Sequence, residues 1–169
     1  MRRERSKTHP ATSQPRPHRR IYDETPDSYG LPGKLPDQTL CPGCRAVYRE
    51  GRWTWVERAV GQAEALCPAC RRIRDRYPAG SLWISGAFAT AHREEIEHLL
   101  RHVEQREKTQ HPLERIMDLR VEGESLRVDT TGVRLVHSLG RALHHAYQGE
   151  LDLAPTGAER PIRVHWRRR

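Results

Sequence analysis

Two short cysteine turns constrain this chain more than any other feature of its sequence. CPGC at residues 41–44 and CPAC at residues 67–70 are separated by 22 residues, and together they hold every cysteine in the chain. Each turn presents two thiolates, and the proline after the first cysteine fixes the backbone where amides must point toward sulfur. The pattern predicts one structural zinc ion in a tetrahedral cage of four sulfur ligands: Cys41, Cys44, Cys67 and Cys70.

Four cysteine ligands leave zinc no open coordination position, so we expect the metal to stabilise the fold and not to catalyse a reaction. Two alternatives are four reduced cysteines without metal, and iron in the same cage. His98 and His102 stand four residues apart, a spacing that would allow a second metal site and an enzyme built on it. The sequence has no serine nucleophile elbow, phosphate-cradling glycine loop or HExxH motif, and we therefore predict a protein that is not an enzyme.

The positive charge of the chain is concentrated at its two ends. The formal net charge is +8, yet residues 1–20 hold seven basic residues and one acidic residue, and three arginines occupy residues 167–169. Such a basic arm favours polyanionic partners, although it also serves simply to keep a protein in solution. With no apolar run of about 20 residues and no secretory signal, we expect a cytoplasmic protein with no membrane partner and with reduced cysteines.

Periodicity divides the sequence into four parts and predicts an α+β fold. Residues 1–40, rich in proline and arginine, are predicted to form a disordered basic arm. Residues 41–90 are predicted to form the zinc ribbon, with a hairpin turning at residues 50–51 and an extended piece at residues 81–88. Apolar residues at helical spacing predict a helix over residues 91–110, which ends at His111 because Pro112 follows.

Residues 111–169 are predicted to form a ββαββ domain. Its helix, at residues 133–148, has an apolar stripe that includes Leu135, Leu139 and Leu143. A four-stranded antiparallel sheet covered by one or two helices would bury this stripe. The other side of the helix would either contact a phosphate backbone or simply be solvated. We expect that side to carry Arg134, His137, Arg141, His144, His145 and Gln148.

Arginines gather around the two cysteine turns. Their guanidinium groups suit phosphates, and the neighbouring Tyr48, Trp53 and Trp55 suit bases, which together predict a nucleic-acid contact surface. The predicted contact residues are Arg45, Arg49, Arg52, Arg71, Arg72, Arg74, Arg76 and Arg141. In the alternative interpretation the tryptophans, with Trp83, form a small core, and the arginines offset the negative charge of a zinc–thiolate cage.

Five stretches of the sequence resemble a known family. CPGCRAVYREGRW, CPACRRIRDRYPAG, HPLERIMDL and GRALHHAYQGELDL, with RVHW, resemble a bacterial family of small zinc-ribbon proteins. More distantly, the chain is similar to nonsense-mediated decay protein three, the export adaptor of the large ribosomal subunit. The resemblance implies a paired-cysteine zinc region, followed by an α+β domain, that acts on the ribosome. It also implies that the four cysteines are metal ligands. The adaptor has further zinc ligands and longer downstream domains, so nuclear export is not carried over.

The leading hypothesis is a zinc-stabilised protein that binds ribosomal RNA or a ribosomal particle, in ribosome quality control or in stress-linked translational control. The alternative is a zinc-ribbon adaptor that binds a protein partner without contacting nucleic acid.

Overall fold

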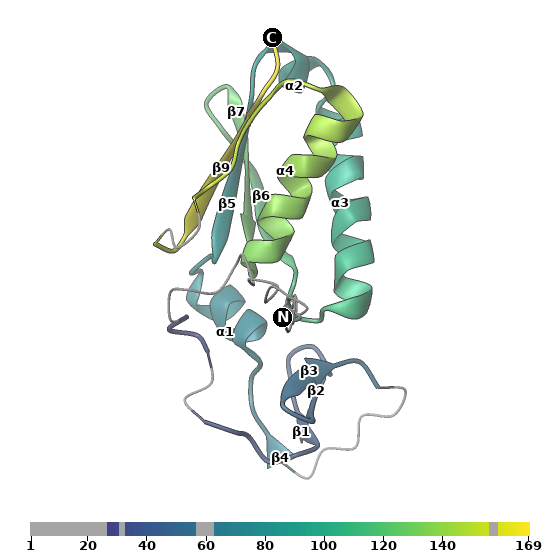
Figure 1. The fold of residues 1–169 in the computed structure, drawn as a ribbon, viewed down its shortest axis with the longest axis vertical. Helices are drawn as coiled ribbons and strands as arrows, with labels where there is room; N and C mark the ends of the chain where they lie inside the picture. Colours follow the sequence, from purple (N-terminus) through teal and green to yellow (C-terminus); the bar gives the residue numbers. More distant parts are fainter. Residues whose placement is uncertain (1–26, 31–32, 57–62, 156–158) are drawn as a thin grey trace, which may run out of the picture.

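The computed structural model describes residues 27–30, 33–56, 63–155 and 159–169 of the chain. These residues form a small cysteine-containing ribbon and a larger sheet-and-helix unit, joined through a short helix (Figure 1). The predicted α+β fold class is confirmed. Most of the predicted disordered arm, residues 1–26 and 31–32, lies outside the described residues. Its expected boundary at residue 40 is wrong, because Thr39 and Leu40 are buried and form the first strand of the ribbon.

The ribbon is a four-stranded sheet in the order β3-β2-β1-β4. Its strands are β1 (Thr39–Leu40), β2 (Val47–Arg49), β3 (Arg52–Thr54) and β4 (Ala63–Glu64). The predicted hairpin is confirmed: β2 and β3 pair antiparallel around Glu50 and Gly51, which both have positive φ, of 51° and 83°. Positive φ at both central positions is the conformation of the tight turns that match the twist of a hairpin.

Helix α1 (Pro68–Asp75) begins directly at the second cysteine turn. Cys67 is its N-cap, Pro68 stands at the first helical position, and Arg76 ends it in the left-handed conformation with φ 53°. Proline is favoured at a helix start because its missing N–H has no helical partner to lose. This helix was not predicted, because the eight residues are too few to show a clear apolar period.

The larger unit is built on a five-stranded sheet in the order β6-β7-β5-β9-β8, and this corrects the expected four-stranded antiparallel sheet. The strands are β5 (Gly80–Ser85), β6 (Ile116–Glu122), β7 (Ser125–Thr130), β8 (Glu150–Asp152) and β9 (Ile162–Arg167). The extended piece that we placed with the ribbon is β5, the central strand. It pairs antiparallel with β7 and parallel with β9. Its buried Leu82 and Ile84 need the helices of this unit as cover, and the ribbon cannot supply that cover.

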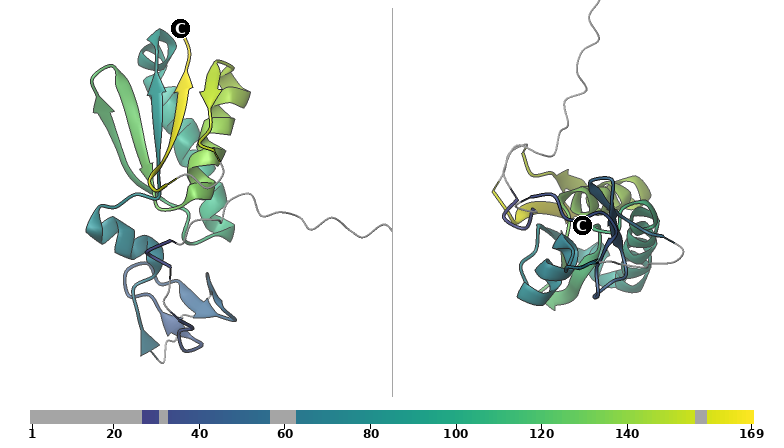
Figure 2. Two further views of the ribbon diagram at one scale, coloured as in Figure 1. Left: turned by 60° about the vertical axis from the view of Figure 1, so that its left-hand side comes forward. Right: turned by 90° about the horizontal axis from the view of Figure 1, so that it is seen from below.

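Three helices complete the unit: α2 (Ala87–Ala91), α3 (Arg93–Gln110) and α4 (Val133–Tyr147). Helices α3 and α4 run antiparallel on one side of the sheet, and no helix of the described residues lies over the other side (Figures 1 and 2). Strand β9 alternates between buried and exposed residues, as expected for a sheet covered on one face. None of the described helices combines the length and the apolarity needed to cross a bilayer.

The core lies between the helices and the sheet. The predicted apolar stripe of α4 is confirmed, with Leu135, Leu139 and Leu143 fully buried. They pack with side chains from the sheet, including Trp166, whose indole N–H donates to the carbonyl of Gln148 over 2.8 Å. His137 was expected on the solvated side of α4, but it is buried at 7% exposure. Burial and the nearby Arg141 lower its pKa, so the neutral imidazole is favoured.

Candidate metal centre

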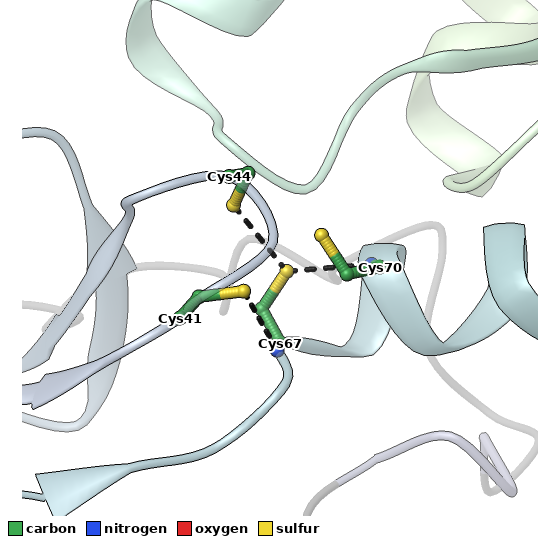
Figure 3. A group of neighbouring side chains, drawn as sticks. All are labelled: Cys41, Cys44, Cys67 and Cys70. Atoms are coloured by element: carbon green, nitrogen blue, oxygen red, sulfur yellow. Dashed lines mark hydrogen bonds between the residues drawn. The ribbon is translucent and has the colours of Figure 1, made fainter.

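The four cysteines come from two local structures that aim at one point (Figure 3). Cys41 follows β1, and its N–H donates to the carbonyl of Ala46 over 2.8 Å, which closes the first turn. Arg45 completes this turn in the left-handed region, with φ 70°. The second turn is the start of α1, where the N–H of Cys70 donates to the sulfur of Cys67 over 3.4 Å. The N–H of Cys67 in turn donates to the sulfur of Cys41 over 3.3 Å, which ties the two turns together.

The structure brings all four predicted ligands together. Their sulfur atoms lie within 4.8 Å of one another, and the sulfurs of Cys44 and Cys67 are 3.7 Å apart. Cys41 and Cys67 are buried and the other two are half-buried, so the cage is closed on the protein side. All four thiols are free of disulfide bonds. Four converging thiols, with backbone amides donating to sulfur, can hold one metal ion.

The closeness of the sulfurs changes the acidity of the thiols. The contact with Cys67 lowers the pKa of Cys44 to about 5, and the same contact raises the pKa of Cys67. Burial raises the pKa of Cys70. The first proton is therefore lost easily and the remaining ones are held, because thiolates this close repel one another. A divalent cation relieves that repulsion, and metal binding at such a site releases protons.

Arg115 completes the cage from the other unit, and sequence reasoning did not select it. Its Nη2 donates to the sulfurs of Cys67 and Cys70, each over 3.3 Å, and the residue is only 9% exposed. Burial disfavours its charge, but the hydrogen bond to Cys70 and the nearby sulfurs outweigh this effect and raise its pKa. The guanidinium is thus a fixed positive charge against the thiolates. The only signal was its place within HPLERIMDL, one of the stretches that carry the family resemblance.

The position of Arg115 depends on the larger unit. Its N–H donates to the hydroxyl of Thr131 over 2.9 Å, and the N–H of Thr131 donates to the carbonyl of Arg115 over 2.9 Å. A second link joins the ribbon to the end of α3, where the indole N–H of Trp55 donates to the carbonyl of Lys108 over 2.7 Å. The cage is therefore held by contacts from both units.

The arginines predicted to contact nucleic acid occupy different environments. Arg45, Arg49 and Arg52 are exposed on the ribbon and form no ion pair with any described residue. On α1, Arg74 is exposed but pairs with Asp75 over 2.7 Å, and Arg71 is half-buried beside the ring of Tyr29. Arg76, at the end of α1, and Arg141, on α4 in the larger unit, are both exposed.

Arg72 corrects the prediction, because it is not available to a partner. Its side chain is 1% exposed, pairs with Asp27 and donates to the carbonyl of Tyr77 over 3.1 Å. Its guanidinium also lies over the ring of Tyr29, 4.4 Å from the centroid. Arg72 therefore holds the segment around Asp27 against α1 and serves the fold.

Two of the three ribbon aromatics, Tyr48 and Trp53, are buried in the ribbon core, whereas Trp55 is half-buried. Tyr48 and Trp53, at 7% and 8% exposure, pack edge to face with ring centroids 5.6 Å apart. The alternative interpretation was therefore right for Trp53, which packs with the buried cysteines. It was wrong for Trp83, which lies on the sheet between Arg127 and His165.

His98 and His102 are both exposed on α3. Among the described residues, the four cysteines are the only group of three or more side chains placed to hold a metal ion.

Comparisons of the chain with models of protein families, with curated proteins and with solved structures found no match.

Proposed function

We propose that this protein binds one zinc ion in the cysteine cage and uses the arginines of the ribbon to bind ribosomal RNA, free or within a ribosomal particle. It does so without catalysing a reaction. The closed sulfur cage supports a structural role for the metal, because four protein ligands leave no position for a substrate. The setting that we propose is the cytoplasm, in ribosome quality control or in stress-linked translational control.

The chemistry of the cage supports zinc. Thiolates favour zinc or copper(I) over magnesium and calcium, which prefer oxygen ligands. A regular tetrahedron with zinc–sulfur bonds of about 2.3 Å has sulfurs about 3.8 Å apart. The 3.7 Å between Cys44 and Cys67 fits that spacing. When bound, zinc would hold the two turns in one arrangement and so fix the ribbon that carries the arginines.

One observation carries the RNA proposal: two arginines face each other across the ribbon hairpin. Arg49 and Arg52 are direct partners in the register of β2 and β3, both are exposed, and neither forms an ion pair with a described residue. Like charges directly opposite each other in an antiparallel pair destabilise it, by up to about 1 kcal/mol. A polyanion bound to both guanidinium groups removes this repulsion, and exposed Arg45 adds a third charge on the same ribbon.

The test is a titration of wild-type protein and Arg49→Gln/Arg52→Gln with ribosomal RNA over a range of salt concentrations. We expect the variant to bind more weakly and with a shallower salt dependence, by about 0.7 in the logarithmic slope for each lost phosphate contact. Arg163→Gln/Arg167→Gln is the control for net charge, because it removes two exposed arginines of β9 in the larger unit, of which Arg167 pairs with Glu150. Binding that is equal in the hairpin variant and wild type, or a wild-type protein that sediments apart from ribosomal particles at low salt, would refute the proposal.

The second candidate function is a protein adaptor, and one apolar patch favours it. Ile73 and Tyr77, at the end of α1, are 40% and 42% exposed, which makes them two of the three exposed large hydrophobic residues among those described. An adaptor docking there would bind its partner with little dependence on salt and with none on nuclease treatment. Ile73→Ser would then abolish binding, whereas the hairpin variant would leave it intact.

A further inference from the structure

A shallow groove runs between α3 and α4 on the outer side of the helical layer. It encloses about 430 Å³, and Leu99 and Ala142 lie among its apolar residues. The polar side chains that line it are His102 and Arg106 from α3, with Arg141, His145 and Ser138 from α4. No described carboxylate lines this groove. We call it the helix groove.

The arginines of the helix groove have no carboxylate partner among the described residues. Arg106 and Arg141 are exposed and form no ion pair with a described residue. One carboxylate, that of Glu107, contacts a side chain of the groove. This carboxylate accepts from the hydroxyl of Ser138 over 3.2 Å and lies 4.0 Å from the guanidinium of Arg134. It therefore pairs with Arg134 and not with Arg106 or Arg141.

On the opposite face of the same unit, by contrast, two arginines are paired with carboxylates. On the uncovered face of the sheet, Arg120 pairs with Asp118, Glu122 and Asp129. Arg127 likewise pairs with Glu122 and Asp129. Each of these guanidinium groups has carboxylate partners, so this region of the sheet attracts an added anion only weakly. The helix groove, by contrast, brings together two arginines that have no described carboxylate partner, and such a site attracts an anion.

Each of the two helices contributes one arginine and one histidine to the groove. His102 and Arg106 are four residues apart on α3, and so are Arg141 and His145 on α4, a rise of about 6 Å in each helix. Residues four apart share one face of a helix. Because α3 and α4 run antiparallel (Figure 1), Arg106 and Arg141 lie toward the same end of the groove and the two histidines lie toward the other. Two guanidinium groups that face one groove can contact a phosphate backbone without reading the bases.

From this arrangement we infer that the helix groove binds the phosphate backbone of an RNA strand, as a second contact surface separate from the ribbon. The inference rests on the proposed RNA-binding function and names a further surface for it. The exposed Arg141 takes part in this surface, and the groove adds Arg106, which the sequence did not single out.

The test compares three double variants of the full chain in salt titrations with the same ribosomal RNA. Arg106→Gln/Arg141→Gln removes the groove charges while keeping polar side chains of similar helix propensity. We expect its logarithmic salt slope to be shallower by about 1.4, at about 0.7 for each lost phosphate contact. Arg106→Lys/Arg141→Lys keeps both charges and should retain the wild-type slope, whereas a purely structural role of the arginines would not be rescued. Far-ultraviolet circular dichroism checks that each variant is folded.

The control variant Arg163→Gln/Arg167→Gln changes the net charge equally on β9. An equal loss of slope in this control would mean that total charge alone decides binding, and would overturn the inference. A wild-type slope in the groove variant would also overturn it, while the hairpin variant would still test the proposed function. Absence of salt-dependent RNA binding by wild type would overturn both.

Discussion

Replacing Arg115 with methionine removes the guanidinium that donates to the cage and keeps an unbranched side chain about as long as the aliphatic part of arginine. In the folded protein this group makes hydrogen bonds to the sulfurs of Cys67 and Cys70 and is 9% exposed. Two hydrogen bonds to charged groups would be worth about 3–6 kcal/mol if nothing replaced them. With metal bound, however, the ion itself neutralises most of the thiolate charge. We therefore expect the loss of Arg115 to cost less, as is usual for residues that only hydrogen-bond to metal ligands. Such losses weaken metal binding about 10- to 100-fold, or about 1.4–2.8 kcal/mol.

The assay is a competition titration with a chromophoric chelator, using zinc or cobalt(II) as the probe. Arg163→Met serves as the control, because that arginine is exposed on β9 and far from the cage. Arg115→Lys should recover part of the affinity, since it restores charge but not the forked donor geometry. If Arg115→Met binds metal as tightly as wild type does, the guanidinium is not supporting the ligands and the reasoning fails.

Two further predictions concern the larger unit. Burial raises the pKa of Glu114 to about 7, although its carboxylate accepts from the N–H of Leu135 at the start of α4. As pH rises, the unfolded state therefore loses this proton before the folded state does. The free energy of unfolding of wild type relative to Glu114→Gln should fall by about 3 kcal/mol between the ordinary pKa of a glutamate and pH 7, and should level off above pH 7. Denaturant titrations at a series of pH values measure this difference. A pH-independent difference would contradict this. Gly86 has φ 101°, and an added Cβ would lie 2.1 Å from the carbonyl oxygen of Arg168. Gly86→Ala should lower the free energy of unfolding by about 1–3 kcal/mol, and an unchanged melting temperature would contradict that.

The features that could be predicted from the sequence are those encoded locally. The cysteine spacing predicted which four side chains meet, and the pair Glu50-Gly51 predicted the hairpin, because each depends on a few neighbouring residues. The apolar stripe of α4 was readable for the same reason. His137 shows the limit of this approach, since it lies on the edge of that stripe and its burial is decided by what packs against the helix.

Long-range pairing could not be predicted in the same way. Strand β5 follows the second cysteine turn closely, so proximity in sequence placed it with the ribbon, whereas its partners β7 and β9 come much later in the chain. Arg72 and Arg115 were misjudged for a related reason. In a sequence with 30 lysines and arginines, nothing local shows which ones are buried against Asp27 or against a thiolate.

The central position of β5 has a consequence for how the chain reaches its native state during synthesis. Gly80 pairs with Thr130 on one side and with Ile162 on the other, so its partners emerge 50 and 82 positions after it. Until then a strand bearing Leu82 and Ile84 has both edges unpaired, which is the condition under which nascent chains associate wrongly. The early-made cysteine turns, with zinc available, would anchor the segment just before it while translation of the later strands continues.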